Sequence, residues 1–284
     1  MILIPVLIAL SLEYYFHWGA ELRQFGWFNL YIKKVESQFE KHSFYVSWIG
    51  VLLIVLGPVF LLYFIVNLFD GTNYFILLFL VSVGALFYSL GPKPLAETMA
   101  GYFSAMERGD QEAAFLRLKE EIDNDDLPES QEFVRNVTRF VLVESNKRYF
   151  GVIFWFIILG PFGALFYRLA YLYHKECQKQ VNEHLIQTTQ LIHWIDWLPA
   201  RLTSFLNLLT GDFLAGFYRL KDYLTDFQSS NNQVLSETGI SALGLTMGLA
   251  EDGVKENRDA MDMVQRTGIF YLVAAIFLSP LALW

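Results

Sequence analysis

Long uncharged stretches alternate with shorter polar ones along this chain. Residues 44–69 and 73–92 contain no charged side chain, and each could cross the ~30 Å hydrocarbon core of a bilayer as one helix. Two further uncharged stretches, 149–167 and 267–284, have a similar length. The pattern predicts an all-α polytopic integral membrane protein with four to five transmembrane helices, accompanied by interfacial and cytoplasmic helices.

The first apolar stretch leaves the number of crossings open. Residues 1–12 are uncharged, but twelve residues cover only about 18 Å as a helix. An extension to Trp18 would span the bilayer only by burying Glu13. Glu13 and His17 are four residues apart, so they are either half of a metal or proton site or, as we expect, interfacial side chains that reach the membrane surface.

Positive charges set the expected orientation of the chain. The turn at 70–72 contains no Lys or Arg, whereas both flanks of the two N-terminal spans do. The positive-inside rule therefore predicts a helical hairpin whose flanks lie in the cytoplasm. Residues 19–43 interleave aromatic and basic side chains, which predicts an amphipathic helix at the membrane surface. The expected location is the inner membrane of a bacterium, crossed several times.

The uncharged run 149–167 allows two interpretations. It crosses the membrane once, or it enters and returns at the Gly-Pro-Phe-Gly break of 160–163. The full division that we predict is an N-terminal anchor, amphipathic helix and hairpin (1–92), a cytoplasmic helical segment (93–149), a membrane core (150–218), a polar helical segment (219–266) and a C-terminal transmembrane helix (267–284).

Local signals define helices within the cytoplasmic segment. Pro94 suits the start of a helix that runs from Leu95 to about Arg108. Gly109 is expected to end this helix, and Asp110 is expected to cap the next one, which continues to about Ile122.

Composition excludes several classes of function. Only 18% of the residues are charged, against about one quarter in soluble domains, which supports a membrane protein. A net charge of -8 argues against nucleic acid as a partner. Cys177 is the single cysteine, which excludes a disulfide framework, and the acidic run 123–126 lacks the glycine and the glutamate of a calcium loop. We find no phosphate-loop, zinc-protease or dinucleotide motif, and we expect no cofactor.

The polar residues of greatest interest lie beside apolar sequence that glycine and proline interrupt. One group precedes the run that ends at Arg168, and the other lies in the segment 191–203. Polar groups in such surroundings are where membrane proteins build sites. The candidate ligand-binding residues are Glu144, Asn146, Arg148, Tyr167, Arg168, His193, Asp196 and Arg201.

The spacing of these residues leaves two explanations open. Glu144 and Arg148 are four residues apart, and His193 and Asp196 are three apart, so each pair shares a helix face. Buried ion pairs that fix helices against each other would explain the charges, for example Arg201 or Arg168 with Glu144 or Asp196. A pocket for a small anionic ligand, bound by the arginines, is the other explanation. No third metal ligand is identifiable, so we predict no metal site and no catalytic residue.

Three stretches resemble motifs of the CobD/CbiB superfamily of membrane proteins. These stretches are Ala105–Ala114 (AMERGDQEAA), Gly163–Arg168 (GALFYR) and Trp197–Thr203 (WLPARLT). Members of that superfamily form an amide bond during cobalamin synthesis. The chain departs from their pattern after Ile122 and at 169–173, where the resemblance would require groups that hold phosphate and Mg²⁺.

The chain is more similar to the AmpE branch of that superfamily. The similarity lies at Asn146–Phe150 (NKRYF), Ile195–Leu202 (IDWLPARL) and Asn232–Leu235 (NQVL). This resemblance implies an inner-membrane regulatory or accessory protein that is linked to β-lactamase induction or envelope sensing and is not itself a catalyst. An ATP-dependent amide-forming ligase and a structural or transport partner remain alternatives. The implied partners are the lipid bilayer and either a small anionic ligand or another envelope protein.

Overall fold

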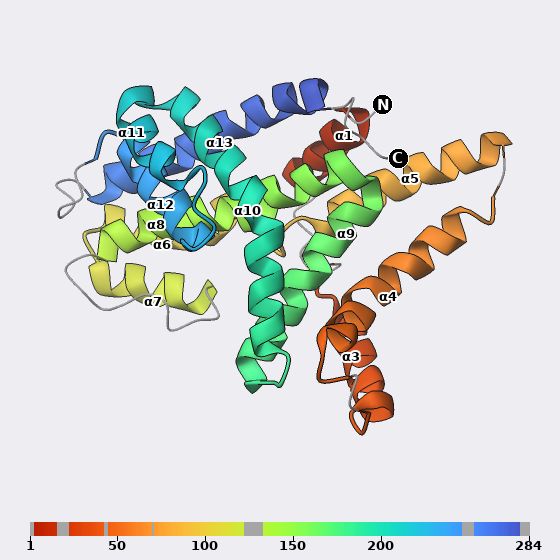
Figure 1. Ribbon diagram of the computed structural model, residues 1–284. Coiled ribbons are helices and arrows are strands. Elements are labelled where there is room, and N and C mark those ends of the chain that lie inside the picture. Colours follow the sequence, from red (N-terminus) through yellow and green to blue (C-terminus); the bar gives the residue numbers. More distant parts are fainter. Residues whose placement is uncertain are drawn as a thin grey trace. The chain divides into compact units, whose positions relative to one another are not determined.

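The structure is a computed structural model, described for residues 3–15, 23–42, 45–69, 71–121, 133–245 and 253–278. Over these ranges all regular elements are helices and no strand occurs, which confirms the all-α prediction (Figure 1). The chain forms two compact units. Unit 1 contains residues 1–92, 151–196 and 274–284, and unit 2 contains residues 93–150 and 197–273.

Among the described residues, three helical segments are long and apolar enough to cross a membrane. They are Trp48–Val66, Phe133–Gln180 and Val254–Phe277, and the shorter apolar helices Leu3–Glu13 and Tyr74–Ser89 accompany them. These five segments overlap the uncharged stretches on which the sequence prediction of a polytopic membrane protein depended.

Unit 1 is built around a helix hairpin that packs on a third helix. Helices α4 (Trp48–Val66) and α5 (Gly71–Ser89) both pack against α9 (Gly151–Gln180). Gly71 and Thr72, which we expected in the turn, are the first residues of α5. The remaining elements of unit 1 include α1 (Leu3–Tyr15), α3 (Gly26–Phe39), the first part of α10 (Leu185–Thr210) and the end of α13 (Gly253–Leu278).

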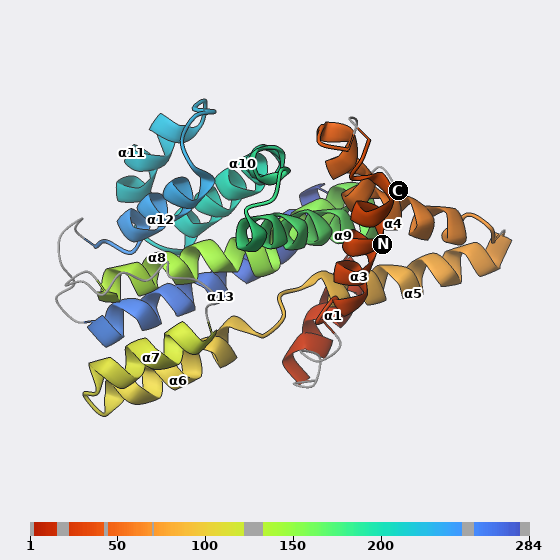
Figure 2. The same ribbon diagram turned by 90° about the horizontal axis from the view of Figure 1, so that it is seen from below.

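Helix α9 reverses its direction at Gly160. This residue has φ 65° and ψ -151°, a backbone conformation that is open to glycine and costly for other residues. Pro161 follows and has no N–H to continue the helical hydrogen-bond ladder. The limb after the break runs back along the limb before it (Figures 1 and 2). The change of direction lies within the run 149–167, and the choice between one membrane crossing and an entry with return stays a prediction.

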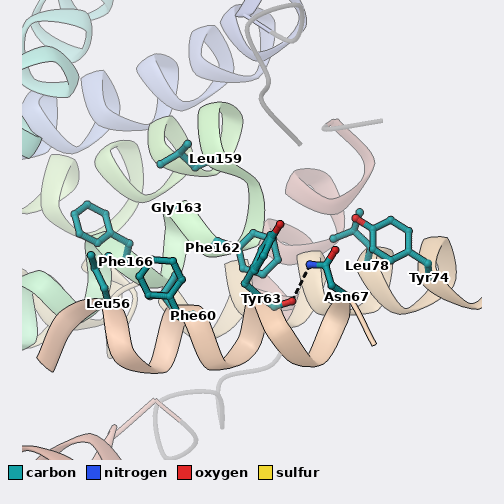
Figure 3. Close-up of a pocket in the computed structure, with 11 residues that line it drawn as sticks. Leu56, Phe60, Tyr63, Asn67, Tyr74, Leu78, Leu159, Phe162, Gly163 and Phe166 are labelled. Carbon is teal, nitrogen blue, oxygen red and sulfur yellow. Dashed lines mark hydrogen bonds between the residues drawn. The ribbon is translucent and has the colours of Figure 1, made fainter. Parts of the chain in front are cut away.

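Two glycines allow the limbs of α9 to approach each other. A Cβ on Gly151 would lie 2.2 Å from the hydroxyl of Tyr167, and a Cβ on Gly163 would lie 2.2 Å from the carbonyl oxygen of Trp155. Both distances are far below van der Waals contact, so only glycine fits at these positions. The returning limb turns Phe162 toward α4 (Figure 3).

Glu13, which we expected as an interfacial side chain, is enclosed by other parts of the protein. It is buried and forms an ion pair with Arg23. Arg23 also donates to the carbonyl of Gly91 at 2.7 Å and lies over the ring of Phe87, with 4.3 Å between the guanidinium carbon and the ring centroid. His17 lies outside the described residues, as does the acidic run 123–126.

Unit 2 begins with the helix pair that the sequence predicted. Helix α6 (Leu95–Glu107) ends before Gly109, which has φ 76°, and α7 (Gln111–Glu121) follows. The side chain of Asp110 accepts a hydrogen bond from the N–H of Ala113 at 2.9 Å. The expected glycine stop and aspartate cap are therefore confirmed.

The rest of unit 2 packs around α8 (Phe133–Ser145). Helix α12 (Asn231–Ala242) lies on α8, where a Cβ on Gly239 would be 2.7 Å from Leu142, and α11 (Phe213–Tyr223) packs on α12. We expected a polar segment to 266 and a separate span after it. Instead, α13 (Gly253–Leu278) runs through this boundary as one helix, because its polar half buries Glu256 and Asn257 in unit 2.

Candidate functional site

A π-helical segment, η1 (Asn146–Phe150), joins the end of α8 to α9. A π-helix accommodates an additional residue per turn and often occurs at functional sites. Its side chains at Asn146, Arg148 and Phe150 are all buried. Every second side chain of η1, starting with Asn146, is therefore buried in unit 2.

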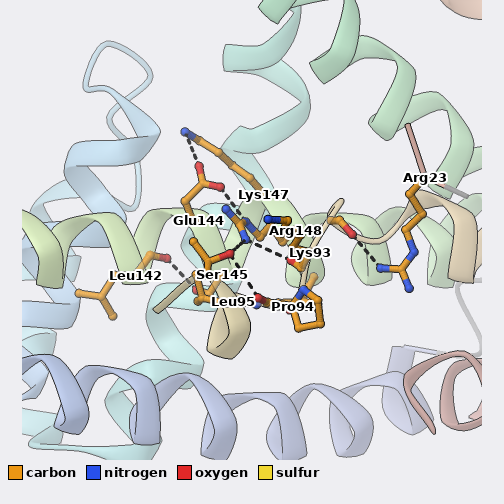
Figure 4. Close-up of polar contacts among 12 residues, drawn as sticks. Arg23, Lys93, Pro94, Leu95, Leu142, Glu144, Ser145, Lys147 and Arg148 are labelled. Atoms are coloured by element: carbon orange, nitrogen blue, oxygen red, sulfur yellow. Dashed lines mark hydrogen bonds and ion pairs between the residues drawn. The ribbon is translucent and has the colours of Figure 1, made fainter. Parts of the chain in front are cut away.

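Arg148 fastens the start of α6 to η1 (Figure 4). Its Nε donates to Glu144 at 2.9 Å, and its Nη1 donates to the carbonyl of Lys93 at 3.1 Å and to the hydroxyl of Thr98 at 2.8 Å. Lys147 contacts the other carboxylate oxygen of Glu144 at 3.4 Å. The negative charge of Glu144 is thus balanced within its own helical segment, and not by an arginine of another helix as we had considered.

Tyr149 completes this attachment. Its hydroxyl accepts a hydrogen bond from the N–H of Leu95 at 2.9 Å. Leu95 is the first residue of α6, where backbone N–H groups have no partner inside the helix. The side chain of Tyr149 therefore satisfies a helix N-terminus that proline and alanine nearby could not cap.

Asn146 connects η1 to two more helices of unit 2. Its Oδ1 accepts from the hydroxyl of Thr203 on α10 at 2.8 Å, and the same hydroxyl lies 2.8 Å from that of Tyr271 on α13. The ring of Tyr271 stacks on Phe150, with 4.7 Å between centroids and 7° between planes. Because Asn146, Thr203 and Tyr271 are completely buried, a change in any one of them must be accommodated by the others.

Arg201 is held by the loop that precedes α12. Its guanidinium donates to the carbonyls of Tyr223 at 3.0 Å and Asp226 at 2.5 Å and to the side chain of Asn231 at 3.0 Å. It also lies over the ring of Trp197, 4.2 Å from the centroid. Arg148 and Arg201 therefore bind different parts of unit 2 and do not converge on one point.

The loop itself is ordered by Asp226. Its carboxylate accepts from the hydroxyl of Ser229 and from the N–H of Gln228, the latter at 2.7 Å. The Ser229 hydrogen bond, followed by that of Gln228, holds the pKa of the Asp226 carboxyl below its usual range. The ring of Phe227 stacks on Trp197 at 4.5 Å, which closes the loop over the Arg201 side chain.

Asp196 occupies a buried position in unit 1. Its carboxylate accepts hydrogen bonds from the hydroxyl of Tyr167 at 2.6 Å and from the hydroxyl of Tyr171. Both tyrosines come from the returning limb of α9, so the fold-back at Gly160 creates this contact. Phenol donors on two sides make Asp196 a hydrogen-bonded carboxylate that ties α10 to α9.

The other two candidates in unit 1 have separate surroundings. Arg168 is buried, and its Nε donates to the carbonyl of Ser89 at 2.5 Å. His193 is half-buried and packs edge-on against Trp194, with 5.7 Å between ring centroids. In the part of the chain that the structure describes, no group of three His, Cys, Asp or Glu side chains could hold a metal ion.

The sequence reasoning missed a second polar cluster in unit 2. Arg135 and Glu256 form a buried ion pair with N–O distances of 2.6 and 3.1 Å, and Thr138 donates to the same carboxylate at 2.9 Å. The hydroxyl of Tyr102 donates to Asn257 at 2.5 Å. No local pattern marks these residues, because Arg135 and Glu256 lie in segments whose composition is that of a solvated helix.

The three arginines of the candidate set share one feature. Each donates to a backbone carbonyl of the protein itself: Arg148 to Lys93, Arg168 to Ser89 and Arg201 to Tyr223 and Asp226. Such contacts position helices and loops. This arrangement suits a framework in which each cation stabilises a helix junction.

Comparison with known proteins identifies the family of the chain. A family model described as regulatory signalling modulator protein AmpE matches residues 1–281. Protein AmpE of Shigella flexneri is 23% identical over an alignment 293 residues long, which covers 98% of this chain and 98% of that protein.

Cobalamin biosynthesis protein CobD of Chromobacterium violaceum is 27% identical over 174 residues, which are 60% of this chain but only 55% of that protein. No solved structure matches the chain. Since the family model covers almost the entire sequence and the apolar helices are those of a membrane protein, the chain belongs to the AmpE family.

Proposed function

We propose that this protein acts in the bacterial inner membrane as a regulatory component that influences β-lactamase induction, without catalysing a reaction. The observation that carries the proposal is the match to the regulatory signalling family over residues 1–281. The similarity to protein AmpE of Shigella flexneri, which extends over nearly the full length of both chains, adds support.

The geometry around η1 is consistent with a regulatory role. Asn146, Thr203 and Tyr271 connect three helices through shared hydroxyl and amide groups. A buried network of this kind has few alternative arrangements, because each arrangement must satisfy all its members. We expect a signal, whether a small anionic ligand or another envelope protein, to act by changing how these helices are joined.

A complementation experiment tests the proposal. A strain with an inducible chromosomal β-lactamase is deleted for its own copy of this gene, and β-lactamase activity is measured with and without a β-lactam inducer. We expect the deletion to alter induction and the intact gene to restore it. Thr203→Val, which removes the central hydroxyl at nearly constant volume, should fail to restore it although the protein is present in the membrane.

The matched control is Thr189→Val on the same helix. Thr189 is exposed, and its hydroxyl bonds only to its own helix at the carbonyl of Leu185. This variant should complement like the native gene. Normal induction in the deletion strain would contradict the regulatory proposal. Equal behaviour of the two valine variants would show that the hydrogen-bond network around η1 has no part in the regulation.

The relation to cobalamin biosynthesis protein CobD supports a second candidate, an ATP-dependent amide-forming ligase. Purified protein is tested for Mg²⁺-dependent ATP binding and hydrolysis. For the non-catalytic proposal we expect neither. Binding that Glu144→Ala abolishes, while the exposed Glu112→Ala retains it, would establish the ligase candidate instead.

A further inference from the structure

A hollow of about 470 Å³ lies in unit 1 between α4, α5 and the returning limb of α9 (Figure 3). Leu56 and Phe60 line it from α4, and Phe162 and Phe166 line it from α9. Gly163 also borders the hollow, and a Cβ there would meet the opposite limb of α9, 2.2 Å from the carbonyl oxygen of Trp155. Phe162 and Phe166 follow the break at Gly160, so the returning limb brings both rings to the hollow.

The polarity of the hollow changes along its length. Its greater part is lined by aliphatic and aromatic side chains, whereas Tyr63, Asn67 and Tyr74 gather at one end (Figure 3). Asn67 donates through Nδ2 to the carbonyl of Tyr63 at 2.8 Å, which leaves its amide oxygen at the rim. The residues that line the hollow include no charged side chain. The hollow thus complements a molecule with a long apolar part and a neutral polar group at one end.

The dimensions of the hollow match those of one membrane leaflet. Leu56 on α4 and Asn67, the residue that follows this helix, are eleven positions apart, which is about 16 Å along a helix. That length is about half of the ~30 Å hydrocarbon core. Helix α4 has the composition of a membrane span, and Phe60 is 63% exposed, so the hollow is continuous with the lipid-facing surface of α4.

We propose that this hollow binds one acyl chain of a membrane phospholipid. The terminal methyl group lies beside Leu56 and Phe166, and the ester group lies beside Asn67 and Tyr63, where an amide and a phenol can form hydrogen bonds with it. The acyl chain fills the space that α4 and α9 leave between them at the hollow. A bound lipid would thereby fix the distance between α4 and the returning limb.

Photolabelling tests the proposal. The full-length protein is placed in vesicles of phosphatidylethanolamine and phosphatidylglycerol that contain a trace of phosphatidylethanolamine with a diazirine at the end of one acyl chain. After irradiation, labelled residues are identified by mass spectrometry. We expect label at Phe166 and Leu56 severalfold above that at Leu61, which is 61% exposed on α4 but does not line the hollow.

Variants that fill the hollow provide the second arm. Leu56→Trp or, from the α5 side, Leu78→Trp should reduce label at Phe166 severalfold, whereas Leu61→Trp should not. Monodisperse elution of each variant confirms that it is folded. Because the two filling variants lie on different helices, the test remains possible if one of them fails to fold. Label that follows exposure alone, or label at Phe166 that neither filling variant reduces, would overturn the proposal.

Discussion

The buried ion pair between Arg135 and Glu256 gives the most stringent test of the fold of unit 2. Both side chains are 3% exposed, and two hydrogen bonds of 2.6 and 3.1 Å join them. Removing one partner from such a pair leaves a buried charge without compensation and costs about 3–5 kcal/mol. We expect Arg135→Met to lower the free energy of unfolding by an amount in this range, and Glu256→Leu to do the same.

The double variant tests whether the cost of each single variant comes from the lost hydrogen bonds or from the unpaired charge that is left buried. Replacement of both partners by apolar residues of similar volume is often neutral or stabilising. In this variant the hydroxyl of Thr138 loses its acceptor on Glu256 and keeps the hydrogen bond that it accepts from Asn257 at 2.8 Å. Glu256→Leu alone loses the same acceptor, so this loss does not affect the comparison of these two variants. We therefore expect the double variant to be more stable than either single variant, with a coupling energy of about 3 kcal/mol or more between the two positions.

Reversible unfolding in mixed micelles, followed by far-ultraviolet circular dichroism, measures these free energies. The matched control is the ion pair of Arg258 with Glu107, whose side chains are 52% and 57% exposed. An exposed pair contributes about 0–1 kcal/mol, so its single variants should be nearly neutral. If the costs at Arg135 and Glu256 simply add in the double variant, the two charges do not depend on each other and the reasoning fails.

Three further predictions concern the fold-back, the loop before α12 and the topology. Gly163→Leu should abolish monodisperse elution in size-exclusion chromatography, because the added side chain meets the opposite limb of α9. Gly84→Ala, which has open space around the added Cβ, should elute normally. Normal elution of Gly163→Leu would contradict the fold-back. The lowered pKa of Asp226 stabilises the protein above the ordinary carboxyl pKa of ~3.9, and this contribution is lost as the pH falls through the lowered value. Asp226→Asn should therefore melt earlier than the native protein at neutral pH, with a difference that shrinks in acid; a constant difference would refute this. A reporter fused after Gln228 should be active in the cytoplasm, because α9 returns toward the side from which it came, and periplasmic activity would show a full crossing.

Local sequence signals predicted the elements whose causes are local. Gly109 and Asp110 end one helix and cap the next through contacts within four residues. Glu144 and Arg148 pair because residues four apart share a helix face. The apolar runs predicted α4 and α5 because a helix that crosses a bilayer can be identified from its apolar composition and its length.

Contacts between distant residues could not be predicted in the same way. Arg135 and Glu256 are 121 positions apart, and nothing near either residue identifies its partner. Asp196 was expected beside His193 on its own helix, but two tyrosines of α9 bind its carboxylate. Gly160 and Pro161 indicated a break, yet a break permits both a kink and a reversal. The choice between them depends on Gly151 and Gly163, which act only once the limbs meet.

The π-helical segment η1 has a consequence for how this chain tolerates insertions and deletions. Successive residues of an α-helix are about 100° apart around its axis. A helix that carries a π turn holds one residue in excess, so every side chain after Phe150 is rotated by that angle relative to an uninterrupted α-helix. Deleting a single residue from η1 would preserve the helix while changing the register of α9 relative to α8 by about 100°. Trp155 and Tyr167 would keep their partners Ile195 and Asp196, which belong to the same unit as α9. The length of this segment, more than the identity of its residues, then determines which surface the following helix offers.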